Sequence, residues 1–264
     1  MKRLIPVLAF LCWCFIAQSA SASCLVSFPG CVVDTIKTST PGAMNTVTTD
    51  AIDTSTATGI LIGQTWDQTD LTSVSDNSTC GFDNRGGQNS AISVFRWTYI
   101  TNTLSCRKSG HTFTLTKTFG PSDMFGVIVV IAFNTMYSSS AVDGLDHANH
   151  ADTGTSLAIG SFTPSQDNEL VCAGGSVERT DFAAGIPTID SGMTILRSVG
   201  LVSGSNWPLM VACVQQTTAA AINPTFSMAS NSFYSLAALA LFANQPVTSN
   251  GCIAGGLLAA GVGC

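Results

Sequence analysis

Hydrophobic and polar residues alternate most strictly over residues 111–119. The run His-Thr-Phe-Thr-Leu-Thr-Lys-Thr-Phe places threonines at the even positions and larger side chains at the odd ones. Period-two alternation of β-branched and aromatic residues predicts a half-buried strand. A turn over 120–123 then leads into the apolar run Phe125–Phe133, which predicts a second, fully buried strand. Together the two strands indicate a β-sandwich.

Comparable runs continue along the chain, separated by Gly, Asn, Asp, Ser and Pro clusters. No amphipathic helix of ten residues or more interrupts them, which favours a sandwich over alternating βα units. The Ala- and Leu-rich run 233–243 also suits a helix, but a buried central strand has the same continuous apolar sequence. We therefore predict an all-β fold, an antiparallel β-sandwich that is jelly-roll-like and disulfide-stapled. Besides the two strands above, with the first taken from Thr112, the predicted strands are Thr58–Gln64, Leu71–Ser75, Ile92–Ile100, Ser156–Phe162, Glu169–Val177, Met193–Val199, Leu209–Gln216, Thr225–Met228 and Phe233–Phe242.

The first 22 residues have the features of a secretory signal peptide. Lys2 and Arg3 precede a short apolar core, and Ala20-Ser21-Ala22 offers a small-x-small cleavage site. A retained membrane anchor is the alternative, but the apolar core is short for a bilayer span. The sequence therefore predicts a secreted protein, extracellular or periplasmic, with no integral membrane span after cleavage. A place on a cell surface or virion is compatible with export.

The mature chain divides into three parts by composition. Residues 23–56 are a loop-rich, disulfide-containing lead-in in which one edge strand is expected, and 57–243 are the β-sandwich. Residues 244–264 form a Gly/Ala-rich tail. Its apolar run is bounded by Cys252 and Cys264. The tail is interpreted as a disulfide-closed hairpin packed on the body, or as an apolar handle for self-assembly or anchoring.

Eight of the ten cysteines lie outside the signal peptide, and an even number in an exported chain indicates disulfides. None shows the close spacing of a zinc site. The sequence does not determine connectivity, but neighbours along the chain suggest four pairs. These are Cys24–Cys31, Cys80–Cys106, Cys172–Cys213 and Cys252–Cys264.

The net charge of −6 and the low charged fraction of 10% exclude an electrostatic footprint for nucleic acid or anionic membranes. Thr and Ser occupy many polar positions instead, which suits exposed strand faces. The partners expected are a cell surface, a polysaccharide or a second copy of the chain.

Several segments resemble, in the same order, a broad group of bacterial and phage secreted surface β-sandwich domains of mostly unknown function. The resemblance covers about residues 57–243, and it implies a virion or cell-surface accessory role without catalytic residues. Two departures are a longer loop that holds Cys80 and a Ser-rich loop lengthened by a His/Asp cluster. The segments are Ser73–Asn77, Val94–Tyr99, Gly110–Thr116, Val127–Phe133 with the following Ser138–Asp143, Asn168–Val171 and Leu236–Phe242.

The densest group of metal-ligating residue types comprises Asp143, Asp146, His147, His150 and Asp152. Two histidines and a carboxylate suit zinc, and an oxygen-rich set suits calcium. The alternative is a solvated loop between two strands, since Asp and Asn recur in loops because their side chains bond the nearby backbone. The sequence otherwise indicates no cofactor.

Trp66 and Trp207 lie near predicted strand ends, beside Asp67 and Pro208, and are the candidates for a loop-borne ligand site. The alternating aromatics Phe95, Trp97 and Tyr99 share one strand face, which could stack on sugars but is more typical of a core.

Catalytic patterns are weak. No Gly-x-Ser-x-Gly elbow is present, and Glu169 and Glu178 lie at opposite ends of one predicted strand. His111 reads as a strand-edge residue and not as a general base.

The sequence favours a non-enzymatic surface or virion-associated structural protein that adheres to a partner or self-assembles. A carbohydrate-binding module is the first alternative. A metal-dependent hydrolase that uses the Asp143–Asp152 loop is the second.

Overall fold

The computed structural model describes residues 36–38, 46–67, 71–89, 93–119, 126–133, 143, 147–150, 155–177, 188–199, 209–227 and 233–241. These residues form sixteen strands and one short helix, and every strand pairing is antiparallel. The predicted all-β antiparallel fold is confirmed, whereas the jelly-roll topology stays a prediction. The elements are β1 (Ile36–Thr38), β2 (Thr46–Thr48), β3 (Gly59–Asp67), β4 (Leu71–Asp76), β5 (Phe82–Asn89), β6 (Ser93–Ile100), α1 (Thr103–Cys106), β7 (Phe113–Phe119), β8 (Gly126–Phe133), β9 (His147–His150), β10 (Ser156–Ala158), β11 (Glu169–Val177), β12 (Thr188–Ile189), β13 (Thr194–Val199), β14 (Leu209–Gln216), β15 (Thr225–Ser227) and β16 (Phe233–Leu241).

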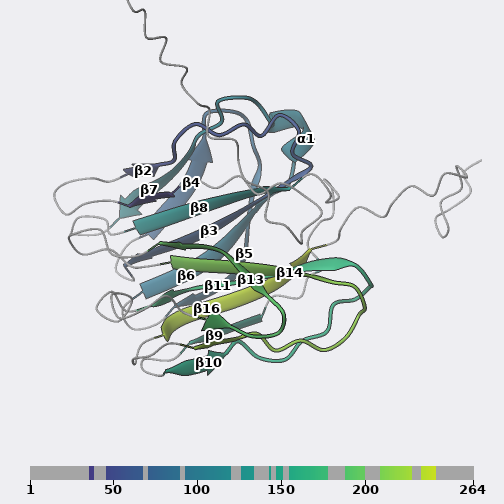
Figure 1. The fold of residues 1–264 in the computed structure, drawn as a ribbon. Coiled ribbons are helices and arrows are strands. Elements are labelled where there is room, and N and C mark those ends of the chain that lie inside the picture. The colour runs from purple at the N-terminus through teal and green to yellow at the C-terminus, as the bar shows by residue number, and fades with distance from the viewer. Residues whose placement is uncertain are drawn as a thin grey trace, which may run out of the picture.

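The strands form four sheets that stack as layers (Figure 1). Two five-stranded sheets, β1-β8-β3-β6-β5 and β13-β14-β11-β16-β9, face each other across one apolar cluster. The three-stranded sheet β2-β7-β4 covers the outer face of the first, and β10-β15-β12 covers the outer face of the second. The central strands of each inner sheet therefore place apolar side chains on both faces.

This layering explains why β8 is apolar throughout. All eight of its residues are buried. Val129 and Ile131 point into the cluster between the two inner sheets, whereas Ile128 and Val130 point toward the β2-β7-β4 layer. A strand between two other layers has no wet face, so alternation disappears and a continuous apolar run remains.

The two halves of the chain repeat the same pattern of strand pairing. Adding eight to each strand number of β1-β8-β3-β6-β5 gives β9-β16-β11-β14-β13, which is the order of the other inner sheet. The same step relates the outer sheet β2-β7-β4 to β10-β15-β12. Isolated bridges repeat too, since Ile52 pairs with His111 in the first half and Phe162 pairs with Ile222 in the second. The partners lie about 110 residues further along in each case. The fold is thus two copies of one eight-strand unit, packed together through their larger sheets.

Eleven predicted strands correspond to observed ones, including the ambiguous last run, which is β16. Three strands lie where none is predicted, β5, β9 and β12. The lead-in also contributes two strands, β1 and β2, which extend one inner and one outer sheet. The loop expected over 143–152 is wrong for residues 147–150, which pair with β16 as β9.

Two disulfides lie within the described residues, and both are pairs that sequence order suggests. Cys172 and Cys213 are register partners in β11 and β14. Cys80 joins the loop after β4 to Cys106 at the end of α1. The pairs Cys24–Cys31 and Cys252–Cys264, together with the signal peptide and the tail, lie outside the described residues. Within the described part of the chain, no helix is long and apolar enough to cross a membrane.

Candidate functional site

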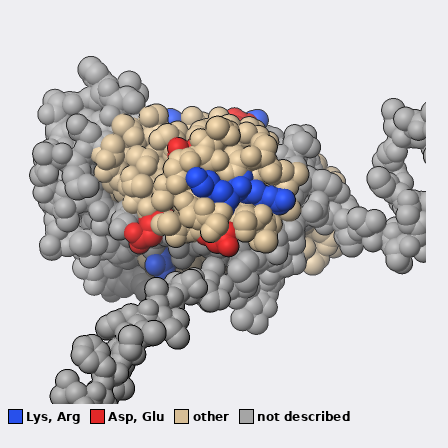
Figure 2. Space-filling model, turned by 90° about the horizontal axis from the view of Figure 1, so that it is seen from above, with Lys and Arg blue, Asp and Glu red and all other residues tan. Residues whose placement is uncertain are grey.

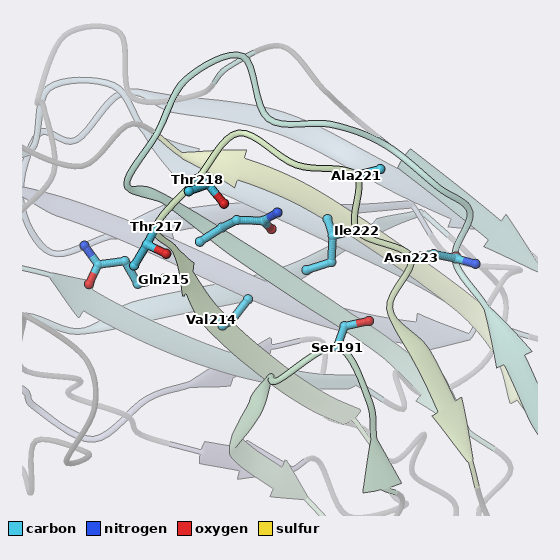
Figure 3. A pocket seen from close by; sticks show the side chains of 9 residues that line it. Ser191, Val214, Gln215, Thr217, Thr218, Ala221, Ile222 and Asn223 are labelled. Carbon is cyan, nitrogen blue, oxygen red and sulfur yellow. The ribbon is translucent and has the colours of Figure 1, made fainter.

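An open pocket lies at the end of the second repeat, where β14 leaves the inner sheet (Figure 3). Its volume is about 400 Å³, and the chain forms it from the end of β14, the following turn and the turn before β13. In Figure 3 the labelled side chains of Val214 and Ile222 form an apolar floor between the surrounding polar groups. The lining residues are Ser191, Val214, Gln215, Gln216, Thr217, Thr218, Ala221, Ile222 and Asn223.

Among the described residues that line this pocket, none carries a charged side chain. Gln216 Nε2 donates a hydrogen bond to the carbonyl oxygen of Ala220 at 2.6 Å, and this bond orients the amide. Its Oε1 atom is buried and has no hydrogen-bond partner in the protein. Asp167 Oδ1 accepts from the backbone N–H of Ala219 at 2.6 Å and so ties the turn to the neighbouring loop. The pocket offers hydrogen-bonding groups without charge.

The equivalent place in the first repeat is filled. Ile222 of the pocket corresponds to His111, since both form the isolated bridge at the same point of their repeat. In the first repeat, α1 and the Cys80–Cys106 disulfide lie between β6 and this bridge. The second repeat crosses the same gap with the shorter turn 217–221, whose residues form no helix and include no cysteine. The two repeats therefore differ at this point, where one is closed and the other is open.

His111 is the centre of a buried polar network in the first repeat. Its side chain is fully buried, and its Nε2 lies 2.9 Å from Oδ2 of Asp76, whose side chain is 4% exposed. Its Nδ1 lies 2.8 Å from Oγ1 of the buried Thr54. When Nε2 carries the proton, it donates to the Asp76 carboxylate, and Nδ1 competes with the carbonyl oxygen of Lys108 for the single hydroxyl proton of Thr54. The ring also packs on Phe113, with centroids 4.2 Å apart.

This network resembles a catalytic triad in its residue types, but no substrate can reach it. His111 pairs with Ile52 in an isolated bridge just before β7, where a strand-edge residue is expected, and its side chain is fully buried. Ligand atoms of Asp76, Cys80 and His111 also lie within 4.8 Å of one another. The sulfur of Cys80 is bonded to Cys106, so it offers no thiolate for a metal ion. The network therefore supports the fold of the first repeat.

Two carboxyl groups meet at the start of β11. The hydroxyl of Ser165 donates to Asp143 Oδ1 at 2.5 Å and lies 3.3 Å from Glu169 Oε1, which also accepts from the N–H of Gln166. Glu169 is fully buried, and its Oε2 has no partner. Burial raises the pKa of Glu169 to about 7, with a further upward contribution from the charge of Asp143. Sequence reasoning treated Glu169 only as a possible partner of Glu178, which lies outside the described residues.

The outer sheets present rows of hydroxyl groups. On the first, Thr46, Thr116 and Ser73 are register neighbours, as are Thr48, Thr114 and Ser75. Thr48 and Thr114 are joined by a hydrogen bond of 2.9 Å between their hydroxyls. Figure 2, seen from above relative to Figure 1, shows mostly uncharged side chains with a short basic band and scattered carboxylates.

The other outer sheet repeats this surface. Ser156, Ser227 and Thr188 are register neighbours across β10, β15 and β12. The side chains on the opposite face of these strands, among them Phe226, belong to the core. The molecule therefore has a hydroxyl-rich surface on each outer side.

The predicted loop position of Trp66 is wrong, whereas the ligand site itself stays a prediction. Trp66 lies inside β3, is 3% exposed, and packs against the guanidinium of Arg96, which lies 5.3 Å from the ring centroid. The chain continues as strand past the residue that was expected to end it, so the tryptophan belongs to the sheet and not to a loop. Trp207 lies outside the described residues. The aromatics Phe95, Trp97 and Tyr99 are buried, as the core interpretation expects.

The predicted metal ligands are only partly described. Asp143 bonds to Ser165, as above, and the backbone of His147 and His150 lies in β9, opposite Ala238 and Ser235 of β16. Asp146 and Asp152 lie outside the described residues. The structure therefore brings Asp143 to Ser165 and Glu169, and the predicted zinc or calcium site stays a prediction.

Comparison with protein-family models finds no family that matches the chain, and comparisons with curated proteins and with solved structures find no match either.

Proposed function

We propose that the chain is a secreted, non-enzymatic structural or adhesive protein of a cell or virion surface. The observation that carries this proposal is the pair of hydroxyl-rich outer faces on a four-layer β block. A mostly uncharged, hydrogen-bonding surface on a stiff sheet suits contact with a polymer or with a second copy of the chain, because it loses little conformational entropy on binding. Two such faces on opposite sides would allow one molecule to bridge two partners.

Other features support the same role. Two disulfides and the apolar cluster between the two inner sheets suit a protein that persists outside the cell. Within the described residues, the one histidine–carboxylate pair is buried, so a substrate cannot contact it. The low charge of the whole chain favours neutral partners.

Adhesion can be tested with the mature chain, residues 23–264, with its disulfides intact. The protein is incubated with isolated bacterial cell envelopes and with insoluble neutral polysaccharides, and depletion from solution is measured beside release of reducing ends. Light scattering on a sizing column reports self-association. We expect depletion or self-association without release of reducing ends. A protein that stays monomeric and in solution, or that releases reducing ends, would contradict the proposal.

A charged variant locates the contact. Thr48→Lys with Thr116→Lys places two cations in the hydroxyl rows of the first outer face. Thr48 is exposed and Thr116 is half-buried, so both lysines can reach solvent. We expect depletion or self-association to fall at least about tenfold if this face makes the contact. Ser161→Lys, at an exposed loop position of the second repeat, is the matched control and should behave as the wild type.

A further inference from the structure

We infer that the open pocket at the end of β14 is a binding site for a neutral glycan. This inference rests on the proposed function, since it names the class of ligand that an adhesive chain would recognise. It begins with the comparison of the two repeats. At the same point, one repeat is filled by α1 and closed by the Cys80–Cys106 disulfide, while the other leaves a hollow of about 400 Å³.

The lining selects the chemistry of the ligand. Small-molecule pockets of this size bind through shape and a few convergent polar groups. Here those groups are the amides of Gln215, Gln216 and Asn223 with the hydroxyls of Ser191, Thr217 and Thr218, and none is charged. An anionic ligand finds no cation in this lining, and a cationic ligand finds no carboxylate. A molecule that carries many neutral hydroxyls matches these donors and acceptors.

Gln216 gives the most specific argument. Its Nε2 is engaged with the backbone, so the amide cannot turn over without losing a 2.6 Å hydrogen bond, and its buried Oε1 is left as an acceptor without a donor. A buried acceptor without a partner is unfavourable, so a donor that reaches this position is favoured. A sugar hydroxyl supplies such a donor once the atoms that cover this oxygen move aside. The apolar floor of Val214 and Ile222 can meet the C–H face of the same sugar ring.

The sheet around the pocket disfavours a peptide ligand. Extended peptides commonly bind by adding a strand to a free sheet edge. Strand β14 is already paired on both sides, with β13 and β11, so the pocket offers no unpaired backbone edge of that strand. Recognition by side chains therefore fits better than strand addition.

The test uses the disulfide-intact mature chain and isothermal titration with cellohexaose, chitohexaose, xylohexaose and mannohexaose. Ala221→Phe places a ring at the pocket wall, and Ala219→Phe places the same ring in the same turn at a residue that does not line the pocket. Gln216→Met keeps the length of the side chain and removes its amide. Thermal unfolding of each variant shows that it is folded.

We expect the wild type to bind at least one of these oligosaccharides. Ala221→Phe should lose at least tenfold in affinity, Gln216→Met about fivefold or more, and Ala219→Phe less than twofold. Absence of binding by the wild type to all four probes, or equal affinity in the wild type and folded Ala221→Phe, would overturn the inference. Depletion by cell envelopes is measured in parallel. If it persists in Ala221→Phe while no oligosaccharide binds, the pocket assignment fails and the adhesive function stands.

Discussion

Gly63 and Gly174 occupy equivalent positions in the two repeats, and each lies against the opposite repeat. Gly63 is the register partner of Trp97, and Gly174 is the register partner of Val211. A Cβ on Gly63 would lie 2.9 Å from Cγ1 of Val211, and a Cβ on Gly174 would lie 2.6 Å from Cζ of Phe95. The two inner sheets therefore approach most closely where both strands lack a side chain.

This contact predicts different costs for the same substitution. Gly174→Ala forces a methyl against the rings of Phe95 and Trp97 and within 3.0 Å of the carbonyl oxygen of Met210, none of which can move freely. Gly63→Ala meets a terminal methyl of Val211, which can yield more easily. We expect about 3 kcal/mol or more of destabilisation for Gly174→Ala and about 1–2 kcal/mol for Gly63→Ala. Denaturant unfolding with intact disulfides measures both, with Ser75→Ala on an outer face as control. A reversed order would contradict this account of the packing.

The His111 network gives a second prediction, because the other repeat shows how the same point is built without it. His111→Ile copies Ile222, but it leaves the carboxylate of Asp76 buried without its partner. Removal of one member of a buried pair costs about 3–5 kcal/mol, so the single variant should be strongly destabilised. Adding Asp76→Ser removes the stranded charge and should recover more than half of that loss. Unfolding free energies of the wild type, both single variants and the double variant form the cycle. A double variant no more stable than His111→Ile would show that Asp76 is not the source of the cost.

Sequence patterns predict the strands that have a regular hydrophobic period. They fail for strands that form because a neighbouring strand pairs with them. The run over 111–119 alternates because β7 has one face in the core and one face toward solvent, and this alternation predicts the strand directly. The segment Phe82–Asn89 has one apolar residue at its start, so β5 is set by pairing with β6 and carries no local signal. His147–His150 reads as a polar loop but forms an edge strand on β16.

The repeat and the candidate pocket were invisible for a related reason. The two units share strand order and register but differ in residue type at equivalent positions, since His111 stands where Ile222 does and Trp97 stands where Val211 does. Among these positions and their register partners, only the pair Gly63 and Gly174 keeps the same residue type. Register follows from hydrophobic pattern and turn geometry, and neither shows in the sequence that two different segments pair in the same way. The pocket depends on a turn that is shorter than its counterpart. Only the structural comparison of the two units shows that the second has no counterpart of α1 and of the Cys80–Cys106 disulfide at the pocket.

The disulfides predict a third result, because the two bonds hold different parts of the fold. Cys172 and Cys213 already face each other in adjacent strands, whereas Cys80–Cys106 ties a loop to a helix of four residues. Chain entropy alone gives roughly 3–4 kcal/mol for loops of these lengths. We expect Cys80→Ala with Cys106→Ala to raise hydrogen exchange over residues 101–110 while the inner sheets stay protected. Cys172→Ala with Cys213→Ala should lower protection across β11 and β14 together. Equal exchange in α1 with and without the first bond would show that the helix does not depend on it.

Glu169 predicts how the stability of the protein depends on pH. Its pKa is raised from 4.5 to about 7 in the folded chain, chiefly because burial disfavours the carboxylate. The folded protein therefore binds this proton more tightly than the unfolded chain does. The associated stability is fully present below the unfolded pKa and is lost as the pH rises through about 7.

Glu169→Gln removes this dependence, because the amide has nearly the same shape and stays neutral. Its oxygen can still accept from Gln166, and its NH₂ group can donate to the nearby Asp143. We expect the variant to match the wild type near pH 4.5 and to be more stable by about 2 kcal/mol near pH 8. Denaturant unfolding across this range measures the difference, and Asp83→Asn, which removes a partly exposed carboxylate beside Arg85, serves as control. Parallel pH profiles for the wild type and Glu169→Gln would show that this carboxyl group is ionised in the folded protein at neutral pH and that burial does not hold its proton.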